Sequence, residues 1–168
     1  MKKLVLSLTL IAGLSTAVNA QKGGAVRKLS IGADIGLPTD NGSKNLMLAG
    51  GSVYYEHPVA KSVNLTGSIG YLSLFSTSKG NQGNIGFTSL KVGGKYYFAG
   101  NFYGAGEVGA TIQREGGRGF FAITPSLGTS FSITDKSSLD LGLRYENWSK
   151  DGNSFGFVGL RAAYAFGS

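Results

Sequence analysis

The chain has 168 residues, enough for one domain, and 42% of them are hydrophobic, which excludes an intrinsically disordered protein. Charged residues make up 15% of the chain, below the roughly 25% of an average soluble domain, and the formal net charge is +7. There is no cysteine and only one histidine, which excludes disulfide frameworks, thiol catalysis and Cys- or His-rich metal sites, so we expect no metal or cofactor.

The first twenty residues have the three parts of a secretory signal peptide. A lysine pair near the start precedes an apolar run from Leu4 to Leu14, and Val18 and Ala20 supply the small residues of a cleavage site. The apolar run is too short to span a membrane as a helix. We expect residues 1–20 to be removed on export and residues 21–168 to form one domain. An exported chain rarely needs nucleic acid, so we interpret its positive charge as an aid to solubility.

Eight later segments alternate apolar residues with polar or small ones, and turn-forming residues bound each of them. None repeats apolar residues at helical spacing over more than a turn. The segments are Lys28–Leu37, Leu46–His57, Val63–Phe75, Ile85–Phe98, Phe102–Ile112, Phe120–Ile133, Leu139–Asn147 and Phe155–Phe166. Their length of roughly 9–14 residues exceeds the usual strand of about 5–6 and suits a tilted, membrane-crossing strand.

The connections between these segments alternate in length. Short turns follow the second, fourth and sixth segments, and longer polar stretches follow the odd-numbered ones. The longer stretches are Pro38–Asn45, Ser76–Asn84, Gln113–Gly119 and Trp148–Ser154. Short turns on one rim and longer loops on the other are typical of membrane barrels. The sequence therefore predicts an all-β fold, a closed eight-stranded antiparallel up-and-down transmembrane β-barrel.

One face of every segment is apolar and free of charge, whereas the other face carries a glycine and all the strand charges, five acidic and five basic. The charged residues are Lys28, Asp34, Glu56, Lys91, Lys95, Glu107, Asp140, Arg144, Glu146 and Arg161. A narrow eight-stranded interior must be filled by side chains, and we expect the glycines to make room for the long charged ones. Equal numbers of both signs favour a closed pairing network that plugs the lumen, because a buried unpaired charge is costly.

Aromatic residues of the apolar face gather near the strand ends, as in the two interfacial girdles of membrane barrels. Tyr55, Phe98, Phe102, Phe131, Tyr164 and Phe166 lie toward the short turns, and Phe75, Phe121 and Tyr145 toward the longer loops. Alternation alone also permits the opposite assignment, a soluble exported barrel that buries its apolar face. That alternative predicts a ligand cavity lined by Ile31, Leu65, Val92 and Leu141.

Hairpin geometry indicates how the charges meet. Counting across the tight turn after the fourth segment places Glu107 opposite Gly93, with Lys91 and Lys95 on its two diagonals. We therefore expect Glu107 to be one centre of the network.

A looser count places Arg161 near Asp140 and, across the barrel closure, near Asp34, which predicts a second centre.

One residue conflicts with a regular strand. Pro125 falls inside the sixth segment, where it removes a ladder donor. We expect a bulge there, or a missing hydrogen bond to the fifth or seventh strand.

The stretch from Gly159 to Phe166 alternates regularly and ends on an aromatic residue two positions from the terminus. It resembles the C-terminal insertion signal of outer-membrane barrels, although Gly167 and Ser168 extend past the usual final aromatic. With the signal peptide and eight segments, the chain resembles the small OmpA/OmpX-type outer-membrane β-barrels. The resemblance implies a monomer in outer-membrane lipid, assembled by periplasmic chaperones and the barrel insertion machinery. Roles in that family range from envelope structure to adhesion.

Some small outer-membrane barrels are lipid-modifying enzymes, which use His with Ser and a carboxylate because Ser needs an adjacent base. The single candidate base is His57, beside Pro58 at a short turn, whereas those enzymes act mostly near the longer loops. We interpret His57 as an interfacial turn residue. The sequence thus predicts a non-enzymatic outer-membrane barrel for envelope structure or surface-loop interaction. A soluble ligand-binding barrel, a lipid-modifying enzyme and a narrow channel are the alternatives.

Overall fold

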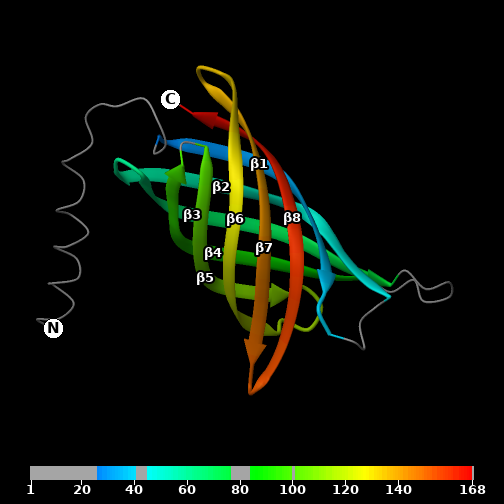
Figure 1. Ribbon diagram of the computed structural model, residues 1–168. Helices are drawn as coiled ribbons and strands as arrows, with labels where there is room; N and C mark the ends of the chain where they lie inside the picture. The colour runs from blue at the N-terminus through cyan, green and yellow to red at the C-terminus, as the bar shows by residue number, and fades with distance from the viewer. Residues whose placement is uncertain (1–25, 41–44, 77–83, 100, 168) are drawn as a thin grey trace, which may run out of the picture.

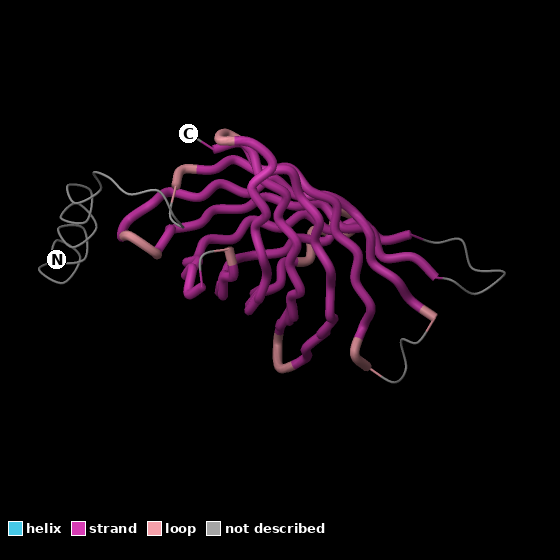
Figure 2. The backbone as a smooth tube through the Cα atoms, turned by 45° about the horizontal axis from the view of Figure 1, so that its top comes forward, coloured by secondary structure: helices cyan, strands magenta, loops and turns pink. Residues whose placement is uncertain are grey.

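The computed structural model describes residues 26–40, 45–76, 84–99 and 101–167. The predicted signal peptide lies outside the described residues. Strands make up nearly all of the described backbone (Figure 2). They are β1 (Lys28–Pro38), β2 (Leu46–Ala60), β3 (Val63–Ser76), β4 (Asn84–Ala99), β5 (Phe102–Gln113), β6 (Gly119–Thr134), β7 (Ser137–Lys150) and β8 (Asn153–Gly167). Within these residues, no helix is long and apolar enough to cross a membrane.

The strands close into a barrel in chain order. Each strand pairs with the next, and β1 pairs antiparallel with β8, so the sheet has no free edge (Figure 1). β2, β4, β6 and β8 finish at one end of the barrel, and the odd-numbered strands finish at the other end (Figure 1). We call these ends the turn side and the loop side. The predicted closed, eight-stranded, antiparallel up-and-down barrel is confirmed.

The connection between β7 and β8 is shorter than the predicted loop Trp148–Ser154, and that prediction is wrong. Both strands continue to a two-residue turn of Asp151 (φ 48°) and Gly152 (φ 80°). Left-handed backbone at both positions is what a tight hairpin turn requires, and Asp and Gly tolerate it best. The strands extend because Trp148 continues the alternation and is buried inside the barrel.

Pro125 interrupts the ladder on one side only. Pairing of β6 with β7 stops at Ile123 opposite Asn147 and resumes at Ser126 opposite Arg144, in unchanged register. On the other side Pro125 stays paired with β5. Because proline has no N–H to donate, the ladder loses pairing to the seventh strand without a bulge. This is one of the two outcomes expected from the sequence.

The apolar face of the strands points outward. Leu90, Val92 and Leu127 are 65%, 60% and 61% exposed, whereas the neighbouring Lys91 is 4% exposed. The four residues that a soluble barrel would turn toward a ligand cavity, Ile31, Leu65, Val92 and Leu141, are all exposed on the outer surface. That alternative is therefore wrong, since the interior is lined by the charged face.

The inward glycines have a stricter role than making room for side chains. A Cβ atom at Gly50, Gly93 or Gly109 would overlap a backbone carbonyl of the neighbouring strand. These positions thus allow adjacent strands to approach where the sheet bends around a narrow lumen. In contrast, a Cβ atom at the outward Gly106 would meet nothing within 4 Å.

Candidate functional site: the charged lumen

Lys95 of β4 lies at the centre of the turn-side half of the lumen and is 2% exposed. Its Nζ donates to Glu56 Oε1 on β2 at 2.7 Å and to Asp140 Oδ2 on β7 at 2.8 Å. The same ammonium lies 3.7 Å from the centroid of the Tyr103 ring and 5.2 Å from that of Tyr97. One cation therefore joins three strands and contacts two aromatic faces, an arrangement that stabilises a desolvated ammonium.

A second cluster lies toward the loop side. Lys91 Nζ donates to Glu146 Oε2 at 2.7 Å and to Thr124 Oγ1 at 3.2 Å. The other oxygen of Glu146 accepts a hydrogen bond from Trp148 Nε1 at 2.7 Å. Arg144 Nε is 3.8 Å from Glu146 Oε2. Both oxygens of this fully buried carboxylate thus have a donor, as burial of a charge demands.

Asp34 of β1 anchors a third cluster at the barrel closure. Arg144 Nη1 is 3.1 Å and Arg161 Nε 4.0 Å from Asp34 Oδ1, and Ser52 Oγ donates to Oδ2 at 2.6 Å. Arg161 also donates to Ser52 Oγ at 2.9 Å. The structure places Arg161 beside Asp34, whereas Asp140, its other expected partner, pairs with Lys95.

Glu107 does not form the expected centre of the network. It does lie opposite Gly93 in the register, but its Oε1 accepts a hydrogen bond from Ser68 at 2.8 Å. Lys91 and Lys95 extend across the lumen to β7 and β2 instead of to the neighbouring strand. The physical reason is that a lumen this narrow brings the opposite wall within reach of a lysine stem.

Lys28 makes no ion pair within 4.0 Å with another described residue. Its Nζ is 3.4 Å from Tyr97 Oη and 3.3 Å from Ser130 Oγ. Eight of the ten predicted lumen charges thus take part in ion pairs within 4.0 Å, and Glu107 and Lys28 have neutral hydrogen-bond partners.

A cavity of about 40 Å³ lies among these clusters, lined by residues that include Asp34, Glu107, Asp140 and Arg144. Asp140 Oδ1 is buried without a hydrogen-bond partner among the described residues, as is Arg144 Nε. At roughly 10–15 Å³ for each water molecule, the cavity has room for on the order of three.

Next to the Lys91–Glu146 cluster, the loop-side end of the interior holds an apolar cluster that we did not predict from the sequence. Leu48, Leu72, Phe87, Ala122, Trp148 and Phe157 form one buried cluster, with Leu74, Ile85, Phe120 and Phe155 packed against it. The ring of Trp148 lies 4.6 Å from Phe87 and 5.2 Å from Phe157, centroid to centroid. These side chains alternate in phase with the charged residues. The alternation of the sequence therefore already placed them on the inward face.

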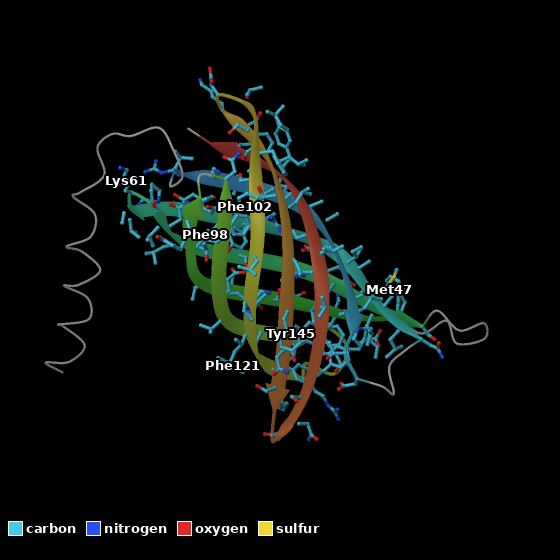
Figure 3. The ribbon with its side chains drawn as sticks, viewed as in Figure 1. Met47, Lys61, Phe98, Phe102, Phe121 and Tyr145 are labelled. Carbon is cyan, nitrogen blue, oxygen red and sulfur yellow. The ribbon has the colours of Figure 1, made fainter. Side chains whose placement is uncertain are left out.

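The outer face carries the predicted aromatic residues toward its two ends. Tyr55, Phe98, Phe102, Phe121, Phe131, Tyr145, Tyr164 and Phe166 are exposed, and Phe75 is half-buried. Figure 3 shows Phe98 and Phe102 near the turn side, and Phe121 and Tyr145 nearer the loop side. The rings of Tyr164 and Phe166 pack edge to face at 4.8 Å. Exposed apolar side chains between two aromatic bands match the demands of a lipid bilayer.

Solved structures share this architecture. The attachment invasion locus protein Ail of Yersinia pestis is 18% identical with a TM-score of 0.57, over 85% of this chain and 99% of that one. Neisserial surface protein A is 12% identical with a TM-score of 0.63, over 84% and 97%. The N-terminal barrel domain of Pseudomonas aeruginosa OprF is 15% identical with a TM-score of 0.54, over 86% and 100%.

This chain has the fold of the small outer-membrane β-barrels. The predicted resemblance to that class is thereby confirmed at the level of the fold. No protein-family model and no curated protein matches the chain.

His57 occupies a peripheral position in this outer-membrane barrel fold. It lies at the turn-side end of β2, where its Nδ1 is 3.5 Å from the exposed Tyr55 Oη. The strand ends that flank the predicted longer connections are at the opposite end of the barrel. Among the described residues, no group of three or more His, Asp or Glu side chains is placed to hold a metal ion.

Proposed function

We propose that this protein is a non-enzymatic barrel of the bacterial outer membrane, with a plugged lumen and a loop-side surface that takes part in interactions. The observation that carries the proposal is the inverted distribution of side chains over the membrane-facing strands. Exposed Leu, Ile, Val and aromatic side chains cover the outside, and the strand charges lie within. Such an exterior would be costly in water and is favourable in lipid.

A plugged lumen is supported by two successive layers of side chains. The ion pairs of Lys91 and Lys95 cross the lumen from β4 to β7, and Arg144 of β7 reaches past β8 to Asp34 of β1. Beyond them lies the aromatic cluster around Trp148, which is 2% exposed. The cavity between the charged groups measures only about 40 Å³. An open ion path would need a continuous hydrated passage, and the apolar layer opposes one.

A role in surface interaction is supported by the position of the loop side in the barrel. With the lumen filled and the outer wall facing lipid, the two ends of the barrel are the parts that reach water, and in outer-membrane barrels the end with the longer loops faces the outside of the cell. The Yersinia neighbour is named as an attachment protein and has also been solved with the heparin analogue sucrose octasulfate, and the Neisserial neighbour is named as a surface protein. Envelope structure without a specific partner is the second candidate, favoured by the rigidity of a fully closed barrel.

Expression of the full chain in a Gram-negative host, followed by separation of the membranes, tests the location. We expect the protein in the outer-membrane fraction, as a folded monomer. We also expect assembly to depend on the barrel insertion machinery, so depletion of that machinery should leave the protein unfolded in the periplasm. Purified protein added to planar bilayers should give no stepwise conductance. Recovery of folded protein in the soluble periplasmic fraction, or discrete channels, would contradict the proposal.

A further inference from the structure

A hollow of about 540 Å³ opens at the loop side, between the β5–β6 loop and the β7–β8 turn. It is lined by Arg118, Phe120, Lys150, Asp151 and Asn153. Its volume lies within the roughly 300–1,000 Å³ of small-molecule sites. The hollow contains two cationic side chains, one carboxylate, one amide and an aromatic ring.

The hollow opens toward water and not toward lipid. Phe120 alternates with the exposed, lipid-side Phe121, and it packs inward against Phe87, with 6.4 Å between the ring centroids. Lys150 follows the buried Trp148 by two residues and so lies on the same, inward phase of β7. Because side chains two apart share a face, the hollow is an extension of the barrel mouth above the aromatic cluster.

Tight turns fix the backbone at the two cationic residues, whose side chains are exposed. The N–H of Gln113 donates to the C=O of Arg118 at 2.8 Å, and the N–H of Arg114 donates to the C=O of Gly86 at 2.8 Å. The β5–β6 loop is thereby fixed both to itself and to β4. Lys150 immediately precedes the two-residue turn that joins β7 to β8.

The combination of groups identifies the class of ligand. An Arg guanidinium and a Lys ammonium bind sulfate or phosphate oxygens through charge-assisted hydrogen bonds. The Asn153 amide and Asp151 carboxylate can hydrogen-bond sugar hydroxyls. The Phe120 ring supplies an apolar surface for the C–H face of a sugar. We propose that this hollow binds a sulfated or phosphorylated sugar unit of a glycan in the surrounding water, an inference that rests on the proposed surface role.

Titration of the full chain in phosphatidylcholine nanodiscs with a sulfated heparin disaccharide tests this site. The double variant Arg118→Gln with Lys150→Gln removes the two cations from the hollow. The matched control Arg114→Gln with Lys136→Gln removes the same charge from residues outside it. We expect the first variant to weaken binding by at least about tenfold, and the control to change it by less than about twofold. The unsulfated disaccharide should bind far more weakly than the sulfated one.

Four results would overturn the proposal. Absence of binding to the original chain, or equal weakening in both variants, would show that the hollow is not a specific site. Equal competition by inorganic sulfate would indicate an anion site that does not recognise sugar. Binding that requires a phosphorylated glycolipid in the nanodisc would assign the cations to a membrane headgroup. Because the membrane fractionation above does not depend on this ligand, failure here is distinguishable from failure of the proposed outer-membrane location.

Discussion

The Lys95 ammonium lies over the ring of Tyr103, 3.7 Å from its centroid, while it donates to carboxylates on two other strands. β4 and β5 are neighbours, but the carboxylates of Glu56 and Asp140 come from β2 and β7. A single side chain thus links both walls of the barrel. Its ammonium is nearly inaccessible to solvent, so water could not replace Glu56 or Asp140 if either carboxylate were removed.

We predict that Lys95→Met strongly destabilises the barrel, because Glu56 and Asp140 then remain buried without their cation. The expected loss is about 3–5 kcal/mol in the free energy of unfolding. Adding Glu56→Gln and Asp140→Asn should recover part of it. Urea unfolding in lipid vesicles measures both effects, and a triple variant less stable than Lys95→Met would show that these groups do not act as one cluster.

Two buried glutamates should respond unequally to neutralisation. Glu146 accepts hydrogen bonds from Lys91 and Trp148, whereas Glu107 accepts one from Ser68. Glu146→Gln leaves Lys91 without its carboxylate, and we expect a cost of about 3–5 kcal/mol. Glu107→Gln keeps an oxygen that can accept from Ser68, so its cost should be about 1 kcal/mol or less. If both variants shift the unfolding midpoint equally, Lys91 does not depend on Glu146 for its charge partner.

Glycine should be required on the inside of the wall and dispensable on the outside. A Cβ atom at Gly93 would overlap the carbonyl oxygen of Gly106 on the next strand, and one at Gly106 would meet nothing within 4 Å. We expect Gly93→Ala to cost more than about 3 kcal/mol or to prevent folding. Gly106→Ala should change stability by about 0.5 kcal/mol or less. The fraction that folds into vesicles and the unfolding midpoint of each variant distinguish the two positions.

Trp148 should report a dry interior. Its ring is surrounded by Phe87, Phe155 and Phe157, with centroids within 5.8 Å. We expect blue-shifted fluorescence that neither aqueous iodide nor brominated lipid quenches. Trp148→Ala should cost about 3–5 kcal/mol because it leaves a large cavity in the cluster. Strong quenching by brominated lipid would place this ring on the outer wall and contradict the apolar layer.

Alternation was enough to predict which residues of a strand share a face, and the charges and glycines of one face predicted that it lies inside. A closed barrel imposes a period of two, so Lys91 and Val92 had to lie on opposite sides of the wall. The tight β4–β5 turn also fixed the register that pairs Gly93 with Glu107. The partners of Lys91 and Lys95 were not predictable in this way. They lie across the lumen on strands distant in sequence, and which of them come together depends on the tilt and diameter of the barrel.

The aromatic interior and the β7–β8 turn were missed for a common reason. Trp148, Phe155 and Phe157 lie on the inward phase, but the ten charges of that face predicted a polar interior. The polar residues around Asp151 then suggested a longer loop. Tertiary packing at the top of the barrel extends both strands to a two-residue turn.

The most direct test of the proposed membrane barrel measures which face of each strand contacts lipid when the protein is in a membrane. The chain has no cysteine, so Val92→Cys and Ser89→Cys each introduce a single site for a nitroxide spin label. Val92 is 60% exposed on the outer wall and Ser89 is buried in the lumen. In lipid vesicles, we predict that the label at position 92 collides readily with oxygen and hardly with a water-soluble nickel complex. The label at position 89 should have little access to either. Ready access of the nickel complex to position 92 would show that the apolar face does not lie in lipid and would contradict the account.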